Sequence, residues 1–199
     1  MNSLKLYVPN SKQDHAFRIH MDEPFAVFEL SNEINNFFQS SSKKDCPIIL
    51  CIGTDRATGD SLGPLTGWKL KSLLSNSNIE ILGTVDYPVH AENLSSVLSN
   101  LSDKIHTHPL IAIDACLGHV SSVGNVVFTN GPIKPGTAVK KSLPEVGDIG
   151  ITGIVNVGGF MEFQVLQNTR LSVVFKMSNL IANSLFLSLT QQIKKTGSL

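Results

Sequence analysis

Cysteine, charge of one sign and long apolar runs are all scarce in this 199-residue sequence, and each shortage excludes a class of protein. Its three cysteines, Cys46, Cys51 and Cys116, form no CxxC pair, which argues against a disulfide framework and against a zinc knuckle. The 16 basic and 16 acidic residues balance, so no overall field attracts nucleic acid. No run of like charges forms a nucleic-acid-binding arm either, and we therefore expect no direct nucleic-acid partner.

The sequence also lacks the signals of membrane proteins. Its first residues contain no apolar stretch of the kind that makes a signal peptide. No uninterrupted apolar run reaches the length of about 18 residues that a membrane-spanning helix needs. We therefore expect a cytoplasmic protein without a membrane partner. With 42% hydrophobic and 16% charged residues, the chain is long enough for one globular domain with a full core.

Short apolar runs alternate with helical patterns after residue 47, which predicts an α/β fold. Strands are expected at residues 48–52, 79–85, 110–113, 120–129, 149–157 and 171–175. Helices are expected at residues 25–38, 64–75, 91–104, 160–168 and 177–193. Residues 1–24 lack clear periodicity and are expected to form an arm or an edge strand. Together the elements predict one three-layer α/β/α domain over residues 1–199, with a mainly parallel sheet centred on strand 110–113.

Two aspartates that follow predicted strands are the strongest indication of chemistry. Asp60 lies in the loop after strand 48–52, and Asp114 directly follows strand 110–113. Ligands and catalytic groups collect at the carboxyl ends of strands in open α/β sheets, so we expect the two carboxyls to share one cleft. Two close carboxyls can hold one proton between them, which suits acid–base catalysis. Taken singly, Asp60 also suits the start of the next helix, and Asp114 also suits bonding to backbone amides.

Four further residues near the same edge are candidates for substrate binding. Asp55 and Arg56 lie in the loop that carries Asp60, and Asp86 and His90 follow strand 79–85. A local ion pair that shapes the loop is the alternative for Asp55 and Arg56. The glycines of this loop fit neither GxGxxG nor a Walker A sequence, which argues against a nucleotide site.

Cys116 stands two residues after Asp114, which raises the question of a nucleophile. No histidine has a sequence-evident pairing with this cysteine, and a nucleophilic thiol needs an activating base. Free cysteine is commonly buried as a small apolar side chain. We therefore expect Cys116 to be a buried thiol.

Three motifs give a more specific indication: GTDRATGDSLGP at residues 53–64, IDAC at 113–116 and GPIKPGT at 131–137. Together they resemble the YyaC-type spore proteases, relatives of the germination protease of spore-forming bacteria, over residues 47–168. The resemblance implies a phosphorylase/hydrolase-like α/β fold and a sporulation-associated peptidase that needs no cofactor. Asp60 and Asp114 would form its acid-protease-like pair. It also implies a protein substrate, the small acid-soluble proteins of spores, and a location in the forespore or spore core.

Two alternatives remain open. The chain more distantly resembles hydrogenase-maturation endopeptidases, which use two acidic residues and a histidine as metal ligands. No histidine stands in the segment PEVGD at residues 144–148, where theirs is expected, and His119 lies outside that position, so we expect no metal site. The other alternative is a catalytically silent protein that binds a peptide or a protein in the same cleft. The oligomeric state stays open, and Asp114 is only narrowly favoured as the base of the pair.

Overall fold

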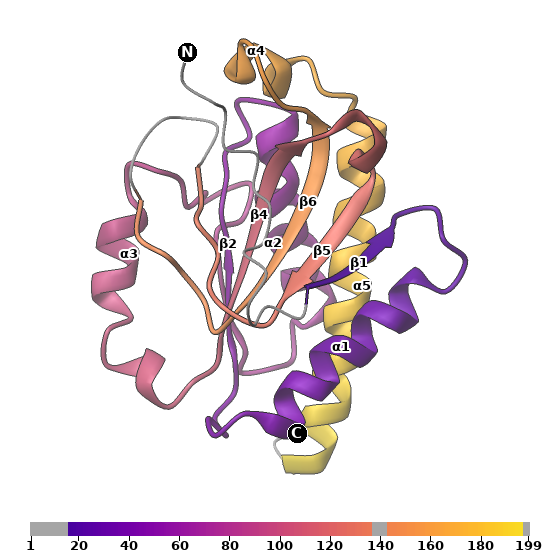
Figure 1. The fold of residues 1–199 in the computed structure, drawn as a ribbon. Helices are drawn as coiled ribbons and strands as arrows, with labels where there is room; N and C mark the ends of the chain where they lie inside the picture. Colours follow the sequence, from indigo (N-terminus) through magenta and orange to yellow (C-terminus); the bar gives the residue numbers. More distant parts are fainter. Residues whose placement is uncertain (1–15, 137–142, 197–199) are drawn as a thin grey trace.

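A computed structural model describes residues 16–136 and 143–196, and a six-stranded sheet in the order β1-β5-β6-β4-β2-β3 forms its centre (Figure 1). The strands are β1 (Ala16–His20), β2 (Ile48–Cys51), β3 (Glu80–Leu82), β4 (Leu110–Gly118), β5 (Asn125–Thr129) and β6 (Ile149–Val157). Parallel pairs join β3 to β2, β2 to β4 and β4 to β6. Antiparallel pairs add β5 and β1 at one edge. The prediction of an α/β fold with a mainly parallel sheet is confirmed.

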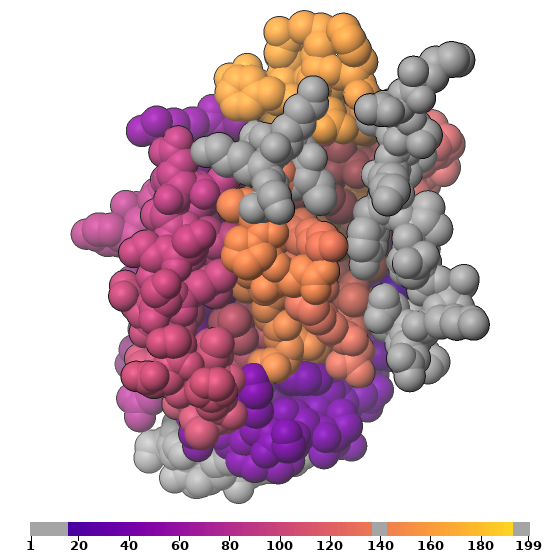
Figure 2. Space-filling model, turned by 60° about the vertical axis from the view of Figure 1, so that its left-hand side comes forward, coloured from indigo at the N-terminus to yellow at the C-terminus, as the bar shows by residue number. Residues whose placement is uncertain are grey.

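Helices cover both faces of the sheet because its strands are apolar on both sides. The longer helices are α1 (Ala26–Ser40), α2 (Leu62–Leu73), α3 (Leu94–Asn100), α4 (Glu162–Gln167) and α5 (Leu171–Thr196). In β2, Ile49 and Cys51 pack into the core beneath α1, α2 and α5, whereas Ile48 and Leu50 pack into a smaller core beneath α3. Figure 2 shows α3 beside the segments that meet at the Ile133–Val146 bridge, and both cover this second face.

Helix α5 corrects one expectation about the strands. Residues 171–175 were expected to form a strand because Val173, Val174 and Phe175 favour β-structure, but they form the first turns of this helix. Val174 and Ile181 are fully buried against the sheet and the neighbouring helices, so tertiary packing overrides the local preference. The segment Leu171–Gln192 is also long and apolar enough to cross a membrane by length and composition alone. Since 56% of its most apolar window is buried inside the molecule, its place as a core helix accounts for that composition.

Several expected elements are present but shorter than their patterns predicted. The second expected strand is reduced to β3, and the helix expected at 91–104 is divided between α3 and the 3₁₀ turn η2 (Lys104–His106). The first part of the strand expected at 120–129 is the 3₁₀ turn η3 (Val120–Ser122). Residues 16–20 confirm the edge-strand alternative for the N-terminal segment as β1, and residues 1–15 lie outside the described residues.

The ends of β2 and β4 position the site. These strands are parallel neighbours with Ile48 opposite Leu110 and Cys51 opposite Ile113, so the chain leaves both at the same edge. After β2, the chain passes through a loop and the 3₁₀ turn η1 (Gly59–Ser61) into α2. Helix α2 begins so close to β2 that a Cβ at Gly63 would lie 2.1 Å from the Ile52 carbonyl oxygen. This close approach turns the loop back over the end of the sheet.

Candidate active site

The six residues singled out by sequence line one cleft at the carboxyl ends of β2, β3 and β4. The cleft has a volume of about 640 Å³. Asp60 reaches it from η1 and Asp114 from β4. The four expected substrate-binding residues also lie on its wall: Asp55, Arg56, Asp86 and His90. The structure therefore gathers residues that are as much as 59 positions apart, from Asp55 to Asp114, around one cavity.

Asp114 is held rigidly at the floor of the cleft. Only 6% of the Asp114 surface is exposed. One carboxyl oxygen, Oδ1, accepts a hydrogen bond from the Ala115 amide at 2.9 Å, and Oδ2 accepts one from the Gly136 amide at 3.3 Å. Gly136 belongs to the motif at residues 131–137, of which Thr137 lies outside the described residues. The motif thus supplies a backbone donor to the buried carboxyl.

Asp60 is held through its main chain and keeps its carboxyl for the cleft. The Thr54 amide donates to the Asp60 carbonyl oxygen at 3.2 Å. Gly53 allows this approach, because its φ is +138° and a Cβ there would lie 2.0 Å from the same carbonyl oxygen. Helix α2 has Ser61 as its N-cap, and no side-chain capping bond is formed there or at η1. Helix capping therefore does not explain Asp60.

The two carboxyls differ in their electrostatic surroundings. Burial, followed by the nearby Asp60 charge, raises the pKa of Asp114 well above its usual range, although the amides of Ala115 and Gly136 partly oppose this. Burial also raises the pKa of Asp60, and the Thr54 amide and His90 oppose that rise. Asp114 is thus the member that retains the proton, and Asp60 is the member that ionises first. The deeper burial of Asp114 favours Asp60 as the base, contrary to the narrow preference for Asp114.

The buried Asp114 carboxyl predicts a characteristic pH dependence of stability. A pKa raised in the folded state contributes stability that is complete below the unfolded pKa and is lost as pH rises through the folded value. Asp114→Asn removes this loss, so its Tm should exceed that of the wild type by several degrees at about pH 8, with a smaller difference or none at about pH 4. Thermal melts across this range, with exposed Asp103→Asn as the matched control, measure the effect. A wild type that gains stability relative to Asp114→Asn on the alkaline side would contradict it.

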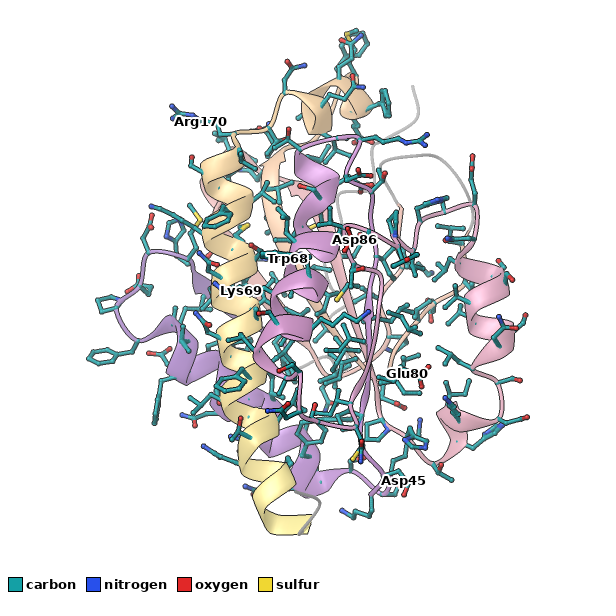
Figure 3. All side chains as sticks on the ribbon, turned by 180° about the vertical axis from the view of Figure 1, so that it is seen from behind. Asp45, Trp68, Lys69, Glu80, Asp86 and Arg170 are labelled. Carbon is teal, nitrogen blue, oxygen red and sulfur yellow. The ribbon has the colours of Figure 1, made fainter. Side chains whose placement is uncertain are left out.

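The remaining candidates occupy the rim of the cleft. Asp55, Arg56 and Asp86 are exposed, and His90 is half-buried. Asp55 and Arg56 make no ion pair with each other in the described part of the chain. Instead the Thr54 hydroxyl donates to Asp55 Oδ1 at 3.5 Å and accepts a hydrogen bond from the Arg56 backbone amide at 3.3 Å. The alternative of a local ion pair is therefore wrong. Figure 3 shows Asp86 nearer the end of the molecule that carries Arg170, whereas Asp45 lies at the opposite end.

Part of the cleft wall was not foreseen. Phe163 and Leu166 of α4, together with Leu143 and Glu92, line the cavity. The pattern at residues 160–168 predicted a helix, but it carried no information on which end of the sheet the helix would cover. The contacts of α4 with η1 and β6 bring its apolar side chains to the site.

Cys116 also lines the cleft, as a half-buried residue. Burial, and then the Asp114 charge, raises the pKa of its thiol to about 12. A thiolate is the nucleophilic form of cysteine, and this environment suppresses it. The structure therefore favours the interpretation of Cys116 as an inert thiol.

The donor set for a metal ion is incomplete. Within residues 16–136 and 143–196, no group of three or more histidine, cysteine, aspartate or glutamate residues is placed to hold a metal ion. Asp60, Asp114 and His90 share the cleft without forming such a group. These residues do not fit a site built from two acids and one histidine.

Comparison with known proteins places the chain in a family. Residues 18–184 match a family described as "Protein of unknown function (DUF1256)". The chain belongs to the DUF1256 family. Over 162 residues, this DUF1256 chain is 49% identical to the Bacillus subtilis (strain 168) protein named "Uncharacterized protein YyaC", and the match covers 79% of the chain and 78% of that protein. The resemblance to YyaC inferred from the three motifs is confirmed as a family relation.

The DUF1256 fold is also similar to a solved protease structure. The crystal structure of the [NiFe] hydrogenase maturation protease HycI from Thermococcus kodakarensis KOD1 matches with a TM-score of 0.53 at 16% sequence identity. The match covers 79% of this chain and 99% of the HycI chain. At this identity the likeness concerns the fold, and it confirms the predicted α/β architecture.

Proposed function

We propose that this DUF1256 protein is a peptidase that hydrolyses peptide bonds through Asp60 and Asp114. The observation that carries the proposal is the meeting of two carboxyls with unequal surroundings in one cleft. Asp114 is buried to 6% exposure and Asp60 is partly open to the cleft. Pairs of titratable groups whose pKa values are pushed apart are typical of acid–base catalysis.

The two carboxyls have complementary roles in the proposed reaction. Asp60 removes a proton from water as the water oxygen bonds to the peptide carbon, while Asp114 gives its proton to the carbonyl oxygen. In the second step Asp114 takes the proton back from that hydroxyl and the carbon–nitrogen bond breaks. Asp60 then protonates the departing amine. Both residues return to their starting states, so the cycle needs no further reactant.

The lining of the cleft supports a peptide as the substrate. Phe163, Leu166 and Leu143 give the cleft apolar lining, and the charged side chains of Arg56 and Asp86 also line it. Clefts with mainly apolar walls and a few directed polar groups are typical of binding sites for organic ligands. By resemblance, we propose the small acid-soluble proteins of spores as substrates, and the forespore or spore core within the cytoplasm as the place of action.

The proposal is tested with purified small acid-soluble spore proteins over a range of about pH 5 to 8, where a buried acid pair can titrate. Discrete fragments are expected from the wild type. EDTA should leave the rate unchanged, because in the proposed reaction Asp60 and Asp114 act as acid and base without a metal ion. Loss of cleavage in EDTA with recovery on adding Zn²⁺ or Ni²⁺ would support a metal-dependent peptidase instead. Binding without cleavage over the whole range would support the catalytically silent alternative.

A further inference from the structure

The loop that carries His90 is bonded directly to the loop that carries Asp60. Val89 forms a parallel bridge with Ile52, and the Gly53 amide donates to the Val89 carbonyl oxygen at 2.8 Å. Thr54, the next residue, donates to the Asp60 carbonyl oxygen at 3.2 Å. Three consecutive backbone contacts thus fix the position of His90 relative to Asp60.

Asn93 holds the His90 loop in shape. Its Oδ1 accepts a hydrogen bond from the His90 amide at 2.8 Å, and its Nδ2 donates to the Pro88 carbonyl oxygen at 3.0 Å. Asn93 is also the N-cap residue of α3, yet its side chain makes no capping bond to that helix. The Asn93 side chain therefore stabilises the loop and does not cap the helix.

The His90 ring is oriented by the same loop. Its Nδ1 accepts a hydrogen bond from the Glu92 amide at 3.3 Å, which leaves Nε2 as the donor of the ring. The ring makes no other hydrogen bond and no ion pair with the residues that the structure describes. A half-buried donor on the cleft wall, with its other nitrogen already engaged, is available to a carboxylate in the cleft.

The charges around His90 show why a donor there stabilises the ionised form of Asp60. Carboxylates outnumber cations on the cleft wall, where the other charged groups are Asp55, Arg56, Asp60, Asp86, Glu92 and Asp114. Arg56 is exposed at the rim, and its side chain makes no ion pair with the described residues. Negative neighbours favour the protonated form of a carboxyl, so ionised Asp60 needs a compensating group.

We propose that His90 is a positioning residue that acts through Asp60 and keeps this carboxylate as the base of the pair. The inference rests on the proposed peptidase function. The sequence indicated His90 only as a substrate contact. The inference adds a role for His90 in deciding which aspartate acts as the base and which as the acid. The lowering effect of His90 on the pKa of Asp60 agrees with this geometry.

His90→Gln tests the proposal, because glutamine keeps a polar side chain but lacks the ring that the Glu92 amide orients, so its donor is not held toward the cleft. The pKa of Asp60 should rise in this variant, so the acid limb of the kcat/KM profile moves to higher pH and activity falls mostly on the acid side. His106→Gln, the same change at an exposed histidine that does not line the cleft, is the control and should leave the profile unchanged. Asn93→Ala, which releases the loop without altering the ring, should move the limb in the same direction.

A second readout does not depend on turnover. Carbon-13 NMR titration of the Asp60 carboxyl reports its ionisation directly in wild type, His90→Gln and His106→Gln. A higher titration midpoint in His90→Gln alone is expected. An unchanged Asp60 titration in folded His90→Gln would overturn the role of His90 even if the enzyme is active. A shifted titration in a protein that cleaves no peptide would keep the His90 contact and overturn the peptidase proposal instead.

Discussion

Asparagine at position 60 or 114 should abolish peptide hydrolysis while the protein stays folded. Asparagine has nearly the shape of aspartate but neither accepts nor releases a proton near neutral pH, so each variant removes one half of the acid–base pair. The expected loss in kcat is about a thousandfold or more for either variant, and the double variant should be no worse than about the poorer single one. Rates on a common peptide substrate, measured with circular dichroism of the same samples, give the result.

Matched substitutions separate catalysis from general electrostatics. Asp86→Asn changes a rim carboxylate of the same cleft and should act mainly on KM. Asp103→Asn changes an exposed aspartate that does not line the cleft and should have no effect. Full activity in folded Asp60→Asn or Asp114→Asn would remove that residue from the mechanism. Equal losses in Asp86→Asn and Asp60→Asn would point to substrate attraction as the common cause.

Gly63→Ala should be a strongly damaging single-methyl change near the site. Alanine normally stabilises a helix relative to glycine by about 1 kcal/mol. At Gly63, however, the added Cβ would lie 2.1 Å from the Ile52 carbonyl oxygen and 2.8 Å from the Ile52 carbonyl carbon and amide nitrogen. These are backbone atoms of the chain leaving β2 and cannot rotate away. We expect the free energy of unfolding to fall by about 3 kcal/mol, at the upper end of overpacking costs.

Urea denaturation of Gly63→Ala, with Ser72→Ala as the control, measures this cost. Ser72 is exposed in the same helix α2, so alanine there should change stability by no more than about 0.5 kcal/mol. The Gly63 variant should also lose peptidase activity in proportion to the displacement of Asp60. A Gly63→Ala protein as stable as the wild type would show that α2 can move away from β2 without cost.

The apolar patterns predicted much of this fold because each buried strand of a parallel sheet must be apolar along its whole length. Residues 149–157 were expected as a strand and form β6 with the same bounds, and residues 110–113 begin the central strand β4. The expectation failed at residues 171–175, where a β-favouring run belongs to a helix. Local preference is weak compared with the burial of Val174 and its helical neighbours against the sheet.

The sequence predicted part of the candidate site, as it predicted part of the fold. Asp60, Asp114 and the four rim residues could be found because chemistry collects where parallel strands end. Phe163 and Leu166 could not, since α4 reaches the cleft from a segment about fifty positions beyond Asp114 in the chain. The alternative of an ion pair between Asp55 and Arg56 is not formed, because adjacency in sequence does not bring two side chains of a turn together.

The class of fold, the two strand ends that bear carboxyls and the family relation follow from local patterns and short motifs in the sequence. The unequal surroundings of the two aspartates, which favour Asp114 as the protonated member, are a property of the tertiary structure. They depend on the depth of burial of Asp114, the amide of Gly136 and the nearness of His90 to Asp60. Desolvation and Coulomb interactions are set by distances between segments far apart in the chain, and no local pattern encodes those distances.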